Sequence, residues 1–348
     1  MAAEVLLDTV KVWQECGRRR AEACQKLGLS PSALDSRIKT AKARGLVEDA
    51  AEPPSPTVEL PTFPDDDISP REIIEIQKKR FDKRHEHAAA KRWFPIKVNV
   101  EGPIGLSFIG DPHVDDNGCN WPLLDAHAAL HKKTPGLFAC NIGDSSNNWV
   151  GRLMALYANQ DTSKQTARKL AKWLLTESGF SWLVWLMGNH DLWNDGDAIL
   201  RGMNVNRIVM EDWQAQFRIV FPNGREAKIW AAHQFQGHSM WNTLHGPQRA
   251  AHTKDAADVY ACGHTHNWAC HQEESASRDF VYWLVRSRGY KFIDDYAEHH
   301  GHASQQEGAS VTAIFNPEAK SMADFVQCFA DMDRAADYLT YLRRRARA

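Results

Sequence analysis

The sequence predicts an α/β fold of stacked layers flanked by helices and preceded by a small all-α domain. Five apolar runs have the length of buried strands, and helical stretches at 123–132 and 152–177 separate some of them. Three consecutive helical patterns before residue 48 predict the small domain. The apolar runs are residues 104–109, 137–142, 182–187, 229–232 and 259–262.

Bulk composition narrows the class of protein. The 348 residues carry a formal net charge of −2, which excludes a uniformly basic nucleic-acid coat but leaves room for a local basic patch. The 7 cysteines are scattered without a C-x-x-C pair, a pattern typical of reduced thiols. The sequence has no leader pattern and no run near the roughly 18 apolar residues of a spanning helix. We therefore expect a soluble cytoplasmic protein without a membrane partner.

Residues 1–47 have the pattern of a helix-turn-helix domain. Apolar periodicity predicts two helices before Gly28, which supplies a turn. Ser30 is a suitable N-cap, Pro31 a suitable first helical residue, and Gly45 a stop signal for a third helix. A trihelical unit of this kind serves either DNA binding or protein interaction and oligomerisation.

DNA is the partner that the charge of this domain favours. Residues 1–47 hold nine Lys or Arg against five Asp or Glu, a balance of +4. Basic side chains on one helix can contact the phosphates of a duplex. The candidate DNA-binding residues on the third helix are Arg37, Lys39, Lys42 and Arg44.

Residues 48–69 contain five prolines and seven acidic residues but no basic residue, which predicts an extended, self-repelling linker. Ser69, Pro70 and Glu72 form a capping box that starts a basic helix reaching about residue 92. The second domain is therefore expected over residues 70–348. Its later elements are expected to be strands at 280–285, 290–293 and 310–315 and a helix at 322–347.

Polar residues of the kind that bind metal ions follow each of the five apolar runs. Because ligand sites in open α/β sheets form at the carboxyl ends of strands, we expect these residues to meet in one cleft. His238 competes with His233 after the fourth run, and His233 is preferred because it directly follows the strand. In chain order the residues are Asp111, His113, Asp144, Asn189, His190, His233, His264 and His266.

The order of motifs resembles the calcineurin-like metallophosphoesterase superfamily. The motifs are Asp-x-His, Gly-Asp, Gly-Asn-His-Asp, His and Gly-His-x-His, and the resemblance covers residues 104–315. It implies a metallophosphoesterase-type β-sandwich flanked by helices. The N-terminal helix-turn-helix and acidic linker resemble phage and prophage members, which would place the protein in a host cytoplasm.

The resemblance implies two groups of metal ligands. The group for the first metal is Asp111, His113 and His266. The group for the second metal is Asn189, His233 and His264. Asp144 would bridge both ions, and His190 would act on the substrate phosphate without binding metal. Mixed carboxylate, amide and imidazole ligands suit Mn, with Fe, Zn or Ni as alternatives.

These features predict a two-metal phosphodiesterase or nuclease that acts on DNA. One alternative is a phosphatase or phosphodiesterase of a small molecule or phosphoprotein, with a regulatory N-terminal module. The other is a non-catalytic DNA-binding protein, which the intact ligand set disfavours. The four residues after Asp144 lack the acidic residue of protein-phosphatase relatives, and this disfavours a phosphoprotein substrate.

Several residues near the ligands are candidates to contact the substrate. Four tryptophans could stack on bases or pack in the core: Trp149, Trp193, Trp241 and Trp268. Three polar residues in the segment after His233 could line the pocket: Ser239, Asn242 and His245.

Overall fold

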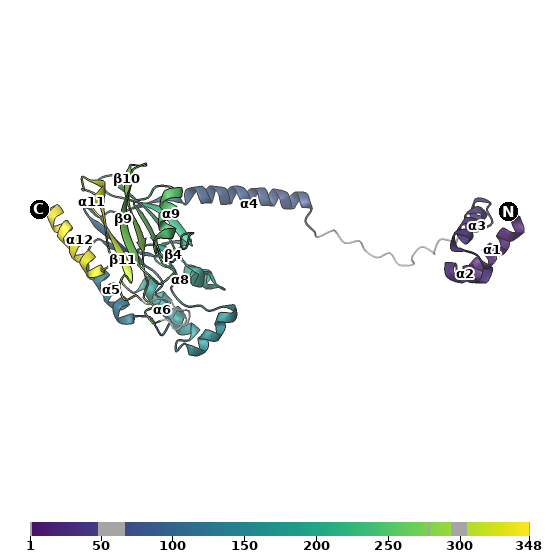
Figure 1. Cartoon of the computed structure of the whole chain (residues 1–348), viewed down its shortest axis with the longest axis horizontal. Coiled ribbons are helices and arrows are strands. Elements are labelled where there is room, and N and C mark those ends of the chain that lie inside the picture. Colours follow the sequence, from purple (N-terminus) through teal and green to yellow (C-terminus); the bar gives the residue numbers. More distant parts are fainter. Residues whose placement is uncertain (1, 48–66, 278, 294–304, 348) are drawn as a thin grey trace. The chain divides into compact units, whose positions relative to one another are not determined.

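A computed structural model of the chain describes residues 2–47, 67–277, 279–293 and 305–347 (Figure 1). The chain divides into two compact units, residues 1–70 and 71–348, and each has its own buried core. Of the expected acidic linker, residues 48–66 lie outside the described residues.

The described residues 2–47 of the first unit form three helices, as the sequence predicts. The Ser30 hydroxyl caps the third helix by accepting a hydrogen bond from the Ala33 N–H at 3.3 Å. Gly28 ends the second helix in the left-handed region, with φ of 61°. The helices are α1 (Ala3–Glu15), α2 (Arg20–Leu27) and α3 (Pro31–Ala43). Their shared core is Leu6, Val10, Ala23, Leu34, Ile38 and Ala41. The DNA partner stays a prediction.

The second unit is built on two mixed sheets, and helix α4 (Pro70–Ala90), which precedes them, buries none of its side chains. One sheet has the order β12-β11-β2-β3-β4-β5, and the other has the order β1-β6-β7-β8-β10-β9. The first sheet consists of β2 (Ile104–Ile109), β3 (Leu137–Asn141), β4 (Trp182–Met187), β5 (Val209–Asp212), β11 (Ser310–Phe315) and β12 (Val326–Phe329). The second consists of β1 (Arg92–Lys97), β6 (Gln214–Val220), β7 (Glu226–Ala232), β8 (Val259–Cys262), β9 (Ala269–Ser275) and β10 (Phe280–Arg286).

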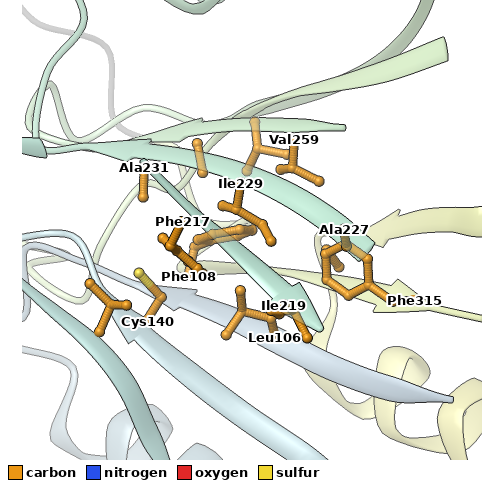
Figure 2. Close-up of a cluster of buried hydrophobic side chains, with 14 of the residues drawn as sticks. Leu106, Phe108, Cys140, Phe217, Ile219, Ala227, Ile229, Ala231, Val259 and Phe315 are labelled. Carbon is orange, nitrogen blue, oxygen red and sulfur yellow. The ribbon is translucent and has the colours of Figure 1, made fainter. Parts of the chain in front are cut away.

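The two sheets pack face to face around one apolar core (Figure 2). Leu106 and Phe108 of β2 belong to the same buried cluster as Phe217 of β6 and Ile229 of β7. Burying a large apolar side chain of this kind is worth about 1.5–3 kcal/mol. The inter-sheet core therefore holds the carboxyl ends of strands from both sheets in fixed positions.

Helices cover the outer face of each sheet (Figure 1). Side chains alternate along a strand, so Trp185 and Met187 of β4 point away from the inter-sheet core and pack with Leu124 and Leu174. The covering helices of the first sheet are α5 (Trp121–Lys133), α6 (Lys164–Thr176) and α12 (Met332–Arg347), and α9 (His245–Thr253) covers the second. The short elements are η1 (Gly151–Asn159), α7 (Asn189–Leu192), α8 (Gly196–Met203) and α11 (Met322–Phe325). The predicted layered α/β fold is confirmed.

Three predicted elements were wrong in detail. The helix predicted over 152–177 is broken after η1, and α6 begins anew beyond Ser163, whose hydroxyl caps it. The predicted C-terminal helix contains β12, because pairing with the edge of β11 satisfies the backbone groups of an otherwise open sheet edge. The strand predicted at 290–293 is reduced to an isolated bridge between Lys291 and Cys119.

None of the described helices is long and apolar enough to cross a membrane. All seven cysteines carry free thiols, which is the state that their scattered positions predicted.

Candidate metal centre

The structure brings all the predicted ligand residues to one place. They follow the carboxyl ends of β2, β3 and β4 in the first sheet and of β7 and β8 in the second. The prediction assumed the edge of one open sheet, whereas the site lies where two packed sheets end together. The face-to-face core explains this convergence, because it aligns strand ends from different sheets.

The ligand atoms form overlapping groups. In each group, one candidate atom from every residue lies within 4.8 Å of the others. The groups are Asp111, Asp144, His233 and His264; Asp111, His113 and His266; and His113, Asp144 and His190. Asn189 joins the first group, because its Oδ1 lies 3.0 Å from Nε2 of His233. Two carboxylates thus connect two sets of imidazoles.

Two ligand atoms are buried without a hydrogen-bond partner among the described residues: Oδ1 of Asp111 and Nε2 of His113. Buried polar atoms are rarely left in this state, because the lost hydration is not replaced. A divalent cation satisfies both a carboxylate oxygen and an imidazole nitrogen. The residues present therefore fit metal ions.

Hydrogen bonds outside the cluster orient two of the imidazoles. Nδ1 of His113 donates to Oδ1 of Asn147 at 2.8 Å, and Nδ1 of His233 donates to the Ile142 carbonyl at 2.8 Å. In each ring the Nε2 atom is then the one directed toward the cluster. Metal-binding histidines are commonly held in this way, with the distal nitrogen donating to an oxygen.

The electrostatics of the cluster favour positive charge. Burial raises the pKa of Asp111 to about 6. Burial also opposes ionisation of Asp144, but the nearby imidazoles, His233 first, hold its pKa well below the ordinary value. Burial alone would lower the pKa of His233, yet Asp144 and Asp111 raise it to about 10. The carboxylates therefore stabilise a cation at the position of His233.

The backbone at the site is strained. Five ligand residues have φ between 40° and 72°, a region that residues other than glycine rarely adopt. They are Asp111, His113, Asp144, His264 and His266. A Cβ at Gly188 would collide with the carboxylate of Asp144, and one at Gly263 would collide with that of Asp111. Strain of this kind is concentrated at functional sites.

His190 is held at the edge of the cluster. Its backbone N–H donates to Oδ1 of Asp144 at 2.9 Å, and its Nδ1–H donates to the carbonyl of Asn147. The ring of Trp193 lies against the imidazole, with 4.1 Å between ring centroids. Nε2 is 3.9 Å from Oδ2 of Asp144, and the residue lines the adjoining cleft. Burial lowers the pKa of His190.

A cleft of about 940 Å³ opens beside the metal-ligand cluster. Ser239, Asn242 and His245 line it, as expected, and so does His238, which belongs to none of the ligand groups found among the described residues. The four tryptophans have different surroundings. Trp149 is largely buried but lines the cleft, Trp193 packs on His190, Trp268 fills the space beside Gly308, and Trp241 is 93% exposed.

Two residues without a predicted role organise the site. Asn147 binds His113 through its side chain and His190 through its carbonyl, and its amide also donates to Asp116 at 2.8 Å. Asp191 accepts hydrogen bonds from the N–H groups of Ser145 and Gly188, both at 3.0 Å, and so ties the segment after β3 to that after β4. The only feature of the sequence that could have indicated this role is that Asp191 directly follows Asn189 and His190.

Comparison with known proteins identifies the domain. The chain shares 10% identity with the structure of NAD nucleotidase from Haemophilus influenzae, with a TM-score of 0.36. The match covers 65% of this chain and 49%, about half, of the nucleotidase. It shares 13% identity with a metallophosphoesterase from Sphaerobacter thermophilus over 62% and 85% of the two chains, with a TM-score of 0.32. No curated protein matches the chain. Residues 106–268 match the family model of calcineurin-like phosphoesterases. The second unit therefore carries a calcineurin-like metallophosphoesterase domain, a type of domain that implies metal-dependent hydrolysis.

Proposed function

We propose that the protein is a two-metal-dependent phosphodiesterase that cleaves DNA. The observation that carries the proposal is the convergence of seven ligand-type side chains around two buried, unpartnered atoms, Oδ1 of Asp111 and Nε2 of His113. One ion would be held by Asp111, His113 and His266, and the other by Asn189, His233 and His264, with Asp144 shared. When bound, two divalent cations supply the charge that activates water and stabilises a leaving oxygen.

The chain supplies the remaining chemistry. Because Nδ1 of His190 donates to a carbonyl, its Nε2 is the atom available at the cleft to give a proton to the leaving oxygen. His113 and Asp144 line the cleft, and the carboxylates of Asp111 and Asp144 are almost completely buried. A preorganised polar site of this kind stabilises phosphoryl transfer without a Ser or Cys nucleophile.

The size of the cleft supports a diester substrate. A diester carries a group on each side of the phosphorus, whereas a monoester carries one. The cleft, of about 940 Å³, extends from His113 and His190 to Gly237 and Gly246 and has room for both groups.

The first unit supports DNA as the source of the diester. Lys39, Lys42 and Arg44 are exposed on or just after α3, while Arg37 is half-buried. Exposed basic side chains on one helix can bind duplex phosphates and raise the local concentration of substrate.

Hydrolysis assays with added Mn²⁺ test the proposal. The first substrates are an aryl phosphodiester and an aryl phosphomonoester, and the next are single- and double-stranded DNA. We expect metal-dependent turnover of the diester and of DNA, which is lost in Asp144→Asn. Substitution of the exposed His271, as His271→Gln, is the control and leaves turnover unchanged. Preference for the monoester would contradict the proposed phosphodiesterase activity. Hydrolysis of the aryl diester but not of DNA would contradict DNA as the substrate.

A further inference from the structure

Three cationic side chains lie in the wall of the cleft beside the metal-ligand cluster. Arg286 is the last residue of β10, and Arg288 and Lys291 follow it. Their exposed fractions are only 5%, 3% and 7%, so all three charges are largely removed from water. Burying a charge is costly unless an opposite charge or a full set of hydrogen bonds compensates it.

The three cations are compensated differently. Lys291 forms an ion pair with Asp116, with 3.1 Å between Nζ and Oδ2. The Nη1 group of Arg288 donates to the Lys291 carbonyl at 3.1 Å. Arg288 also donates to the carbonyls of Gly289 and Phe292. Arg286 forms no ion pair among the described residues, and its Nε, like that of Arg288, is buried there without a hydrogen-bond partner. Arg286 is therefore the cation whose charge is least compensated by the chain.

The position of Arg286 relates it to the metal centre. Its Nη1 group donates to the Gly263 carbonyl at 3.3 Å and to the hydroxyl of Thr265. Thr265 lies between the ligand residues His264 and His266, so the guanidinium is fixed against the turn that carries both. Both arginine contacts are to neutral oxygens, which leave the positive charge available to an anion in the cleft.

The buried guanidinium of Arg286 lines the cleft without a compensating negative charge. An anionic group of a substrate bound in the cleft would supply that charge. Lys291 lies beside the part of the centre that carries His190, because its Nζ is 5.7 Å from the ring of Trp149, whose centroid lies 5.1 Å from that of the His190 imidazole. Arg286 instead contacts the turn of His264 and His266. Positive charge therefore borders the cluster on two sides, an arrangement that suits a substrate with phosphates beyond the one that is cleaved.

We propose that Arg286 binds a second phosphate group, adjacent to the scissile phosphate, and that the cleft thereby selects nucleotide chains over isolated diesters. This inference rests on the proposed phosphodiesterase function and specifies its substrate class. Guanidinium binds phosphate through paired N–H groups in a geometry that ammonium does not reproduce.

Three thymidine dinucleotides test the inference: d(TpT), d(pTpT) and d(TpTp). They share one scissile diester and differ only in a terminal phosphate. We expect the wild type to cleave one phosphorylated dinucleotide with a kcat/KM roughly tenfold to hundredfold above d(TpT), as charged hydrogen bonds allow. Arg286→Gln removes this ratio, and Arg286→Lys, which retains the charge, keeps part of it. Arg201→Gln is the control, because Arg201 forms an exposed ion pair with Asp212.

Calorimetric binding of the same dinucleotides, with Ca²⁺ in place of Mn²⁺, tests Arg286 separately from turnover. If Arg286→Gln loses the extra affinity for the phosphorylated dinucleotides, the subsite is supported whether or not they are cleaved. Absence of cleavage by the wild type would contradict only the proposed function. Equal effects of Arg286→Gln on all three dinucleotides would assign Arg286 to the scissile phosphate and overturn the inference. A wild type that neither binds nor cleaves the phosphorylated forms better than d(TpT) would also overturn it. Thermal melting establishes that each variant is folded.

Discussion

Nε2 of His233 lies 2.9 Å from Nδ1 of His264. Nδ1 of His233 donates to the Ile142 carbonyl, so Nε2 of a neutral His233 presents a lone pair to its neighbour. Two nitrogen lone pairs at this separation repel each other unless a proton or a metal ion lies between them. Oδ2 of Asp144, 3.3 Å from Nε2 of His233, adds negative charge to the same point. The geometry of these residues is therefore that of a cation site.

Metal binding should stabilise the folded protein, because the ligands meet only in the native state. We expect a chelator to lower the midpoint of thermal unfolding and Mn²⁺ to restore it. Saturation at a hundred times Kd corresponds to about 2.7 kcal/mol. His233→Ala should abolish the effect of Mn²⁺, whereas His238→Ala, in the cleft but outside the ligand groups, should retain it. Equal midpoints with and without metal would contradict the site.

His190→Ala should reduce kcat by roughly 10²–10⁴-fold, the usual contribution of a positioned general acid. The metal content should stay at two ions per chain, because His190 is assigned to the substrate and not to the ions. Elemental analysis of the purified variant measures this content beside the turnover rate. Loss of an ion from His190→Ala would show that the residue is a ligand instead.

Asn147→Ala should impair metal binding and turnover together. The substitution removes the acceptor that orients His113, while the backbone carbonyl that orients His190 is retained. Loss of such an orienting group typically costs 10–100-fold in metal affinity or activity. Titration with Mn²⁺ measures the affinity, and the exposed Asn159→Ala is the control. Unchanged affinity would mean that His113 is oriented by its packing alone.

Lys39→Ala combined with Lys42→Ala should weaken DNA binding mainly at low salt. Each lost phosphate contact lowers the slope of log affinity against log salt by about 0.9. The double variant should therefore reduce the slope by roughly 1.8, measured by fluorescence anisotropy over a salt series. Lys11→Ala on α1 is the control. An unchanged slope would assign the first unit to protein interaction or oligomerisation.

Two buried histidines should make the protein sensitive to acid. Burial lowers the pKa of His127 to about 4 and that of His131 to about 3, below the ordinary 6.5. The unfolded chain then binds more protons between pH 6.5 and 4, so stability is complete above pH 6.5 and falls as the pH decreases. At about 1.36 kcal/mol per unit, His127 alone accounts for on the order of 3 kcal/mol at pH 4.

Denaturant titrations at several pH values measure this loss of stability. His131→Gln should flatten the decline between pH 6.5 and 4, because the neutral amide has no proton to gain. His271→Gln, at an exposed position, should leave the decline unchanged. The same decline in both variants would mean that groups other than His131 control acid unfolding.

Strands buried on both faces were the most predictable elements. The runs 104–109, 182–187 and 259–262 match β2, β4 and β8 at both ends, because continuous burial requires continuous apolar sequence. Strand β9, which lies at a sheet edge, and the half-buried β6 were not predicted. Their polar residues alternate with apolar ones or face solvent, and such patterns are weak over short lengths.

Local sequence determined which residues could bind metal. Asp111, His113, Asp144 and the residues of 188–191 each follow directly from a strand, and adjacency along the chain is enough to place a side chain at a strand end. The layered fold and the order of the ligand motifs were predictable for the same reason.

Only the tertiary structure decided how these residues cooperate. The partnership of Asn147 with His113 and His190 joins segments that are far apart in the chain. The placement of Arg286 against Thr265 likewise depends on the pairing of β8 with β10. Contacts of this kind arise from sheet pairing and core packing, which involve many distant residues at once, so no local pattern in the sequence records them.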